Sequence, residues 1–341
     1  SAALLLRNTR NTNVEDEVSR YRIKKTPQRP PAEGAPKPKS ISIQNNKEVS
    51  IEEQESTEQE ETPPVVLAPE KTGPGAIKDK VKEIVLGGSR DRIQKYKVML
   101  HPRDLRKNLL EITLAPTYIY NDSQSGYWYR SYNTAGPGMY AGVDLWLTPF
   151  FGIHSSYLTS LSTEIKANTT GSGFIEADHQ WSNFGLRFRS YFGLTRKSKS
   201  INFGLDWSDY ELGISPDASQ RVGIKSSSLR ISLEGRVPET TTKAWLIGLE
   251  ILPSITHEEV KTAIDVKSGA VNSSNAIGFW FGKSIVFDRK NRVYWKLSHR
   301  IEKNLFKGQA NMADPVTATQ PNGVAVTNGT TLFQLGFTWG N

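Results

Sequence analysis

The final residues of the chain alternate between large apolar side chains and small or polar ones. Within residues 331–341, Phe333, Leu335, Phe337 and Trp339 occupy every second position. Because successive side chains of a β-strand point to opposite faces, this segment predicts a strand with one wholly apolar face. The same alternation predicts about ten strands in all, at residues 108–121, 138–149, 151–165, 179–194, 200–213, 221–236, 242–257, 275–287, 292–307 and 329–340.

The connections between these expected strands alternate in length. Short ones fall at residues 147–151, 195–200, 237–243 and 288–291, and longer ones at 121–137, 166–178, 215–220, 257–274 and 308–330. This rhythm is typical of antiparallel strands that run up and down around a barrel. We therefore expect an all-β membrane protein, a closed antiparallel up-and-down transmembrane β-barrel of about ten strands, with eight or twelve as alternatives.

The apolar side chains of each strand share one parity, and this face is expected to touch lipid. Its members include Phe184, Leu186, Phe188, Phe203, Leu205, Ile231, Trp245, Trp295, Phe333, Phe337 and Trp339. Three residues depart from the pattern. Lys283 has the apolar parity, whereas Val222 and Ile224 have the polar one. We attribute these departures to the rims of the barrel or to β-bulges.

The opposite parity carries acids and bases in similar numbers. They are Glu111, Asp144, Arg187, Arg189, Asp206, Arg230, Glu234, Arg236, Glu250, Lys296, Arg300 and Glu302. A ten-stranded barrel is little wider than the eight-stranded kind whose interior is filled by side chains, so these charges are expected to pair. An unpaired buried charge is costly, whereas a paired one is tolerated. The pattern predicts a charge-filled lumen rather than an open pore.

The first 107 residues differ in composition from the rest of the chain. They contain none of the eight Trp and thirteen Phe residues, and a segment without large apolar side chains cannot bury enough surface to fold alone. Residues 1–75 are rich in proline and charge, which predicts an extended arm. The apolar spacing over 76–107 predicts a short helical linker, with helices at 76–86 and 90–100. The barrel would then occupy residues 108–341.

Composition disfavours several other classes of protein. The chain has no cysteine, so it forms neither disulfides nor thiolate zinc sites. Its net charge of +8 is spread along the sequence and mixed with acids, so we do not expect a nucleic-acid partner. No segment approaches the ~18–20 apolar residues of a transmembrane helix. Without an H-E-x-x-H spacing or a phosphate-binding loop, we expect neither metal nor cofactor.

In these features the chain resembles bacterial outer-membrane β-barrel proteins as a class. The resemblance covers residues 108–341 and includes the ending Leu335-Gly336-Phe337-Thr338-Trp339, which looks like the terminal β-signal of that class. It implies a Gram-negative outer membrane, with short turns, both termini and therefore the arm on the periplasmic side. The start at Ser1 fits a removed signal peptide.

The expected function is structural. We expect an anchor or scaffold subunit of a cell-envelope assembly, of a motility, secretion or adhesion type, whose barrel contacts membrane lipid. Residues 1–107 would dock other envelope proteins through their basic and acidic blocks, and peptidoglycan is a further candidate partner. The alternative is a small-solute outer-membrane channel.

A surface enzyme is a third hypothesis. Outer-membrane proteases of the omptin class use Asp and His residues at the extracellular rim, where the carboxylate orients a His that activates water. Asp122, Asp178, His179 and His257 offer the same residue types in or near the long connections. Their spacing is not a motif, and we do not expect an enzyme.

Aromatic residues gather near the ends of the expected strands. Trp146, Phe150 and Phe151 lie by one short turn, and four aromatic residues lie within 127–132, in a long connection. Amphipathic rings favour the interface between membrane and water, so both groups predict a girdle. The second group could instead form a patch that binds a sugar or a partner.

Overall fold

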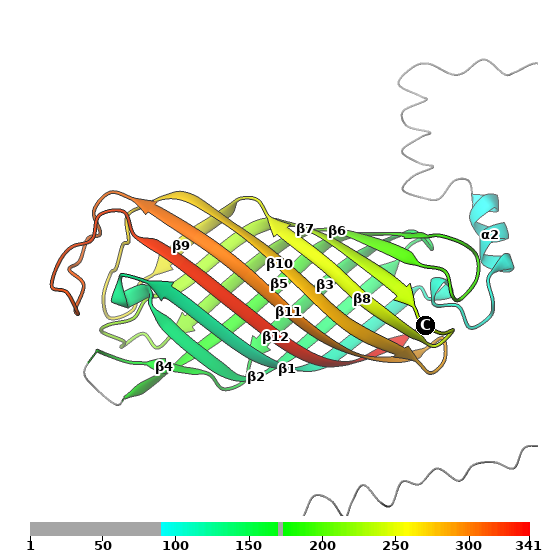
Figure 1. Cartoon of the computed structure of the whole chain (residues 1–341), viewed down its shortest axis with the longest axis horizontal. Helices are drawn as coiled ribbons and strands as arrows, with labels where there is room; N and C mark the ends of the chain where they lie inside the picture. Colours follow the sequence, from blue (N-terminus) through cyan, green and yellow to red (C-terminus); the bar gives the residue numbers. More distant parts are fainter. Residues whose placement is uncertain (1–89, 170–172) are drawn as a thin grey trace, which may run out of the picture. The chain divides into compact units, whose positions relative to one another are not determined.

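The structure is a computed structural model, and it describes residues 90–169 and 173–341 (Figure 1). Helix α2 (Arg90–Met99) and the short 3-10 helix η3 (Leu105–Lys107) precede the strands, and a second 3-10 helix, η4 (Trp128–Arg130), follows the first strand. The strands are β1 (Leu110–Ser125), β2 (Tyr132–Trp146), β3 (Phe151–Ser160), β4 (Glu164–Lys166), β5 (Phe174–Tyr191), β6 (Ser200–Ile214), β7 (Gly223–Pro238), β8 (Lys243–Leu252), β9 (Ile255–Val260), β10 (Ala270–Val286), β11 (Asn291–Lys307) and β12 (Ala325–Gly340).

The strands close into a ten-stranded antiparallel barrel. Each wall strand pairs with its neighbours along the chain, and β1 pairs with β12 to complete the ring. Strand β9 continues the line of β8, and β4 pairs with β5 beyond the end of β3. The predicted barrel and the predicted helix at 90–100 are therefore confirmed, whereas the helix expected at 76–86 and the arm at 1–75 lie outside the described residues.

Two wall strands differ from what the alternation predicts, one being broken and the other longer. The strand expected at 242–257 is divided at Pro253, because a proline nitrogen cannot donate to the ladder. Ser228 on β7 supplies another hydrogen bond at this break, since its hydroxyl donates to the Ser254 carbonyl at 2.8 Å. Conversely, β1 extends to Ser125, through polar residues that lack the apolar alternation.

Outward positions carry the apolar side chains. Phe184 is 64% exposed and Trp339 is 37% exposed. The other residues predicted to face lipid are exposed or half-exposed on the same outer face: Leu186, Phe188, Phe203, Leu205, Ile231, Trp245, Trp295, Phe333 and Phe337. An apolar belt that runs around a closed wall is unfavourable in water and suited to hydrocarbon. No helix among the described residues is long and apolar enough to cross a membrane.

The two ends of the barrel differ. The turns after β2, β5, β7 and β10 are short and lie at the end where the chain finishes, which we call the short-turn end (Figure 1). The other connections gather at the opposite, long-loop end. Lys283 lies near the short-turn end, where its Nζ is 2.6 Å from Glu239 Oε2 and 4.6 Å from the centre of the Trp245 ring. The outward-facing Lys283 therefore lies at the rim of the barrel, as the sequence analysis predicted.

Candidate functional site

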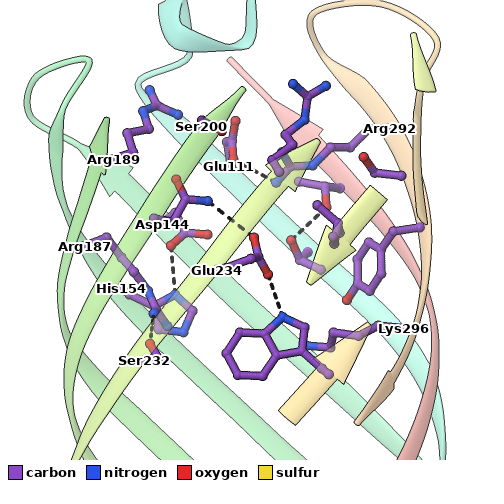
Figure 2. A pocket seen from close by; sticks show the side chains of 18 of the residues that line it. Glu111, Asp144, His154, Arg187, Arg189, Ser200, Ser232, Glu234, Arg292 and Lys296 are labelled. Atoms are coloured by element: carbon purple, nitrogen blue, oxygen red, sulfur yellow. Dashed lines mark hydrogen bonds and ion pairs between the residues drawn. The ribbon is translucent and has the colours of Figure 1, made fainter. Parts of the chain in front are cut away.

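A cavity of about 310 Å³ lies inside the barrel, in the half nearer the short-turn end (Figure 2). We call it the lumen cavity. It exists because inward positions of the strands carry polar side chains there, many of them too small to meet across the lumen. Ten of the twelve charged residues predicted to face inward line it: Glu111, Asp144, Arg187, Arg189, Arg230, Glu234, Arg236, Glu250, Lys296 and Arg300.

A chain of ion pairs crosses one side of the lumen cavity. Asp206, which is 0% exposed, pairs with Arg187 at 3.3 Å and with Arg230 at 3.0 Å. Arg230 continues to Glu250 at 2.6 Å, and Glu250 also pairs with Arg300 at 2.6 Å. These five residues come from five different strands, so their charges tie distant parts of the wall together. Removing one member of such a buried pair typically costs about 3–5 kcal/mol.

The remaining acids of the lumen cavity are engaged separately. Arg292 pairs with Glu111 at 2.9 Å, and His154 Nδ1 lies 2.8 Å from Asp144. Glu234 accepts a hydrogen bond from the Trp280 indole at 3.0 Å. Arg292, His154 and Trp280 were not among the predicted lumen residues, although each lies on the inward parity of its strand.

Four predicted lumen residues lie apart from these ion pairs. Arg189 donates through Nε to the Pro149 carbonyl at 2.6 Å. Arg236 and Lys296 line the cavity but make no hydrogen bond or ion pair with any residue that the structure describes. Glu302 is buried beyond the cavity, where it accepts a hydrogen bond from Asn304 at 2.7 Å.

The long-loop half of the lumen is filled by apolar side chains, which we call the long-loop seal. One of its clusters consists of Tyr132, Ile165, Ala177, Leu212 and Ile224, and a second contains Tyr127, Tyr129, Val222, Val266, Phe306, Ala310, Val324 and Val326. Val222 and Ile224 thus lie near the rim, as expected, but they point inward as part of this packing. In this half, apolar packing that the sequence analysis did not predict lies beside buried charges such as the Arg130–Glu259 pair.

Two buried arginines hold the loops over the long-loop seal. Arg221 donates to the carbonyls of Trp128, Ser131 and Lys166 at 2.6–2.7 Å and stacks 4.2 Å from the centre of the Trp128 ring. Burial lowers the pKa of the Arg221 guanidinium to about 10, so the group stays charged at neutral pH. Arg130 pairs with Glu259 at 2.6 Å and lies 2.8 Å from His257 Nε2.

A third buried arginine joins the segment before the barrel to the short-turn end. Arg106 is 1% exposed and pairs with Asp104 at 2.7 Å. It also donates to the Tyr96 hydroxyl and to the carbonyls of residues 193, 194 and 195 at 2.8–3.2 Å. We call this set of contacts the Arg106 lock. Burial raises the pKa of the Asp104 carboxyl, but the hydrogen bonds and charge of Arg106 outweigh it, so the pKa is lowered.

The exposed apolar belt and the enclosed, paired charges invert the arrangement of a soluble β-protein. A closed wall satisfies its own backbone hydrogen bonds in lipid, and the short-turn and long-loop asymmetry is that of bacterial outer-membrane barrels. This protein is an outer-membrane β-barrel.

Comparisons with known proteins find similar solved structures among bacterial outer-membrane proteins. No family model and no curated protein matches the sequence. OprG from Pseudomonas aeruginosa is 10% identical, with 71% of this chain and 98% of that chain covered and a TM-score of 0.32. The translocator domain of the autotransporter NalP from Neisseria meningitidis is 10% identical, with 73% and 93% covered and a TM-score of 0.33. The transport unit of AIDA-I from Escherichia coli is also 10% identical, with 72% and 96% covered and a TM-score of 0.36.

The Asp and His residues considered for a surface enzyme do not share a face of this outer-membrane barrel. His179 points inward on β5, where it lies 2.8 Å from the Thr134 hydroxyl and 3.0 Å from that of Tyr210. His257 also points inward, whereas Asp122 and Asp178 occupy outward positions. Among the described residues, no group of three or more acidic, His or Cys side chains could hold a metal ion.

Four of the seven aromatic residues expected at the membrane interface are buried, whereas Trp128, Phe150 and Phe151 are half-exposed. Tyr127, Tyr129 and Tyr132 are buried in the long-loop seal, so they form neither a girdle nor an exposed patch. Trp146 is also buried and faces the lumen cavity, with the Arg189 guanidinium 3.7 Å from the centre of its ring. These corrections share a cause, because alternation assigns a side only where the strand is regular and the residues near its ends follow the fold of the loops.

Proposed function

We propose that this outer-membrane barrel is an anchor, a scaffold subunit of a cell-envelope assembly that holds its N-terminal arm at the membrane for partners to bind. The observation that carries the proposal is the Arg106 lock. A buried guanidinium binds three carbonyls of one short turn, together with Asp104 from the segment that enters the barrel. Tension on the arm would therefore be borne by the rim of the barrel rather than by a free linker.

The closed lumen supports the same proposal. An anchor needs no path through its barrel, and the long-loop seal blocks the lumen at one end with close apolar packing. A stretched arm of ~60 residues at ~3 Å each could reach on the order of 180 Å, which is enough to contact peptidoglycan or other envelope proteins.

Deletion of residues 1–75 tests the role of the arm. We expect the shortened chain to insert into the membrane and to resist denaturation as before, while proteins that co-purify with the full chain are lost. A matched control replaces residues 1–75 with an equally long Gly/Ser segment, which keeps the reach and removes the charges. Undiminished co-purification with either variant would contradict the proposal.

A small-solute channel is the second candidate, and the charged lumen cavity is the observation that favours it. Planar-bilayer recordings separate the two functions. An anchor gives no stable conductance steps, whereas a channel gives steps whose ion selectivity changes on reversing the charge of Arg187 or Arg189.

A further inference from the structure

We propose that the lumen cavity binds a small phosphate-type anion that enters from the short-turn end. Ten Arg and Lys side chains line the cavity, against five Asp and Glu side chains. Two of the ten cations are not enclosed, since Arg103 is exposed and Arg196 half-exposed. Asp206, which pairs with Arg187 and Arg230 from behind, makes a sixth carboxylate, so eight enclosed cations minus six carboxylates leaves an excess of two. An enclosed surplus of one sign is costly, and a bound counter-ion relieves it. This proposal does not depend on the anchor function.

The carboxylates of the cavity are already engaged. Each of the five that line it accepts a hydrogen bond or an ion pair from a neighbour: Asp104 from Arg106, Glu111 from Arg292, Asp144 from His154, Glu234 from Trp280, and Glu250 from Arg230 and Arg300. The groups still able to bind a ligand are therefore positively charged hydrogen-bond donors. Such donors favour an anion.

Three cations offer that capacity. Arg236 on β7 and Lys296 on β11 face the cavity and make no hydrogen bond or close ion pair with the described residues. Arg189 is 6% exposed, and its Nη2 is buried without a hydrogen bond. The rest of this guanidinium is fixed, because its Nε donates to the Pro149 carbonyl at 2.6 Å and its plane stacks on Trp146. A donor held in place in this way loses little entropy when an oxyanion binds it.

The size of the cavity limits the ligand. At about 310 Å³ it lies at the lower end of small-molecule pockets, which span roughly 300–1,000 Å³. It would accept a phosphate with a small attached group but not a folded domain. The long-loop seal closes the far side, so entry is from the short-turn end, beside the Arg106 lock. A free phosphorylated solute and the headgroup of a lipid would present the same chemistry.

The test titrates inorganic phosphate into the purified full chain in a neutral maltoside detergent. Chloride is exchanged for phosphate at constant ionic strength, and binding is followed by calorimetry and by the midpoint of thermal unfolding. We expect saturable binding, weakened at least tenfold in Arg236→Gln and in Lys296→Gln. Lys225→Gln is the matched control, because Lys225 lies on β7 with Arg236 but at the long-loop end, with its side chain 52% exposed. It should bind phosphate as the unaltered chain does.

Further variants and a second probe complete the test. Lys296→Arg keeps the charge and should restore binding, while tryptophan fluorescence shows that each variant is folded. Monomeric dihexanoyl phosphatidylglycerol serves as the lipid probe. Binding of inorganic phosphate assigns the site to the free anion, and binding of the lipid probe alone assigns it to a headgroup. The proposal is overturned if neither probe binds, or if Arg236→Gln and Lys296→Gln bind as Lys225→Gln does.

Discussion

At the scale of single residues, glycines decide where the largest inward side chains lie. A Cβ atom on Gly336 would come within 2.1 Å of the Tyr294 ring, and one on Gly248 within 2.2 Å of the Trp280 ring. Both aromatic rings therefore lie flat against a neighbouring strand instead of crossing the lumen. The lumen cavity stays open because β12 and β8, which carry Gly336 and Gly248, have no side chain where the two rings lie.

Substitution of Gly336 by Ala should destabilise the barrel. The added methyl group forces the Tyr294 ring toward the cavity, and overpacking of this kind typically costs about 1–3 kcal/mol. Gly329→Ala on the same strand is the control, since a Cβ there meets nothing closer than 3.6 Å. Denaturant unfolding in detergent measures the free energy of unfolding of both variants. Equal losses in the two variants would refute the role of the ring.

Acid should release the Arg106 lock. The pKa of Asp104 is lowered below its ordinary value of 3.8, so the lock contributes fully above pH 3.8 and is lost as pH falls through the lowered pKa. Because the chain has no cysteine, Lys95→Cys gives a single site for a spin label on α2. We expect the label to become mobile in this acid range, and at neutral pH in Arg106→Ala, because leaving Asp104 buried without its partner typically costs about 3–5 kcal/mol.

An Asp104→Asn variant separates the lock from general acid unfolding. Its label should show no transition of its own in the acid range, because the titrating group is gone. A label that loosens at the same pH with and without Asp104 would show that another group controls the segment.

At the scale of elements, sequence alternation predicts the two faces of a strand but not how the inward face changes along it. Lipid imposes one requirement on every outward position, and so the outward residues could be identified one strand at a time. The inward face has no such uniform surrounding. Its charged half and its apolar half depend on which loops fold over the lumen, and that information lies far apart in the chain.

The sequence also does not predict which charged side chains pair inside the lumen. Arg300 and Glu250 are 50 residues apart, and their 2.6 Å contact depends on the register of β8, β10 and β11. The aromatic residues of 127–132 resembled a surface patch because they lie in a connection. Tyr127 and Tyr129 are buried because they pack with Val222 and Val266, which no local pattern indicates.

Removal of the Arg221 side chain should open the long-loop seal. Arg221→Ala strips charged donors from three carbonyls in two separate segments, two at η4 and one at the end of β4, and the loss should be on the order of 3 kcal/mol. We expect faster chymotrypsin cleavage in the long loops, together with conductance steps that we do not expect from the unaltered barrel. Thr317→Ala, in an exposed part of the last long loop, should change neither property. An Arg221→Ala barrel that stays closed to ions and protease would show that apolar packing alone makes the seal.

At the scale of the whole molecule, the two ends of the barrel are different. The segment that carries the Arg106 lock, the last residue and the short turns share one end, and the long loops share the other. The lumen cavity is closed toward the long loops. The lumen cavity therefore opens at the same end of the barrel as the Arg106 lock and the short turns.

Single cysteines test in cells which end of the barrel faces outward. Thr317→Cys in the long loop after β11 should react with a membrane-impermeant maleimide in intact cells, since long loops of outer-membrane barrels face outward. Lys290→Cys in a short turn should react only after the outer membrane is permeabilised. Both positions are exposed, so access and not burial decides the outcome. The reverse result would place the arm outside the cell.

The pairing of β1 with β12 makes assembly all-or-none. One edge of the first wall strand pairs with β2 and the other with β12, the last 16-residue strand, so the ring closes only when the end of the chain is present. A shortened copy without β12 would leave one edge of β1 and one of β11 facing hydrocarbon with unsatisfied amides and carbonyls. Such a copy could not settle as a smaller barrel of the same shape, and premature stop codons late in the gene should be as damaging as early ones.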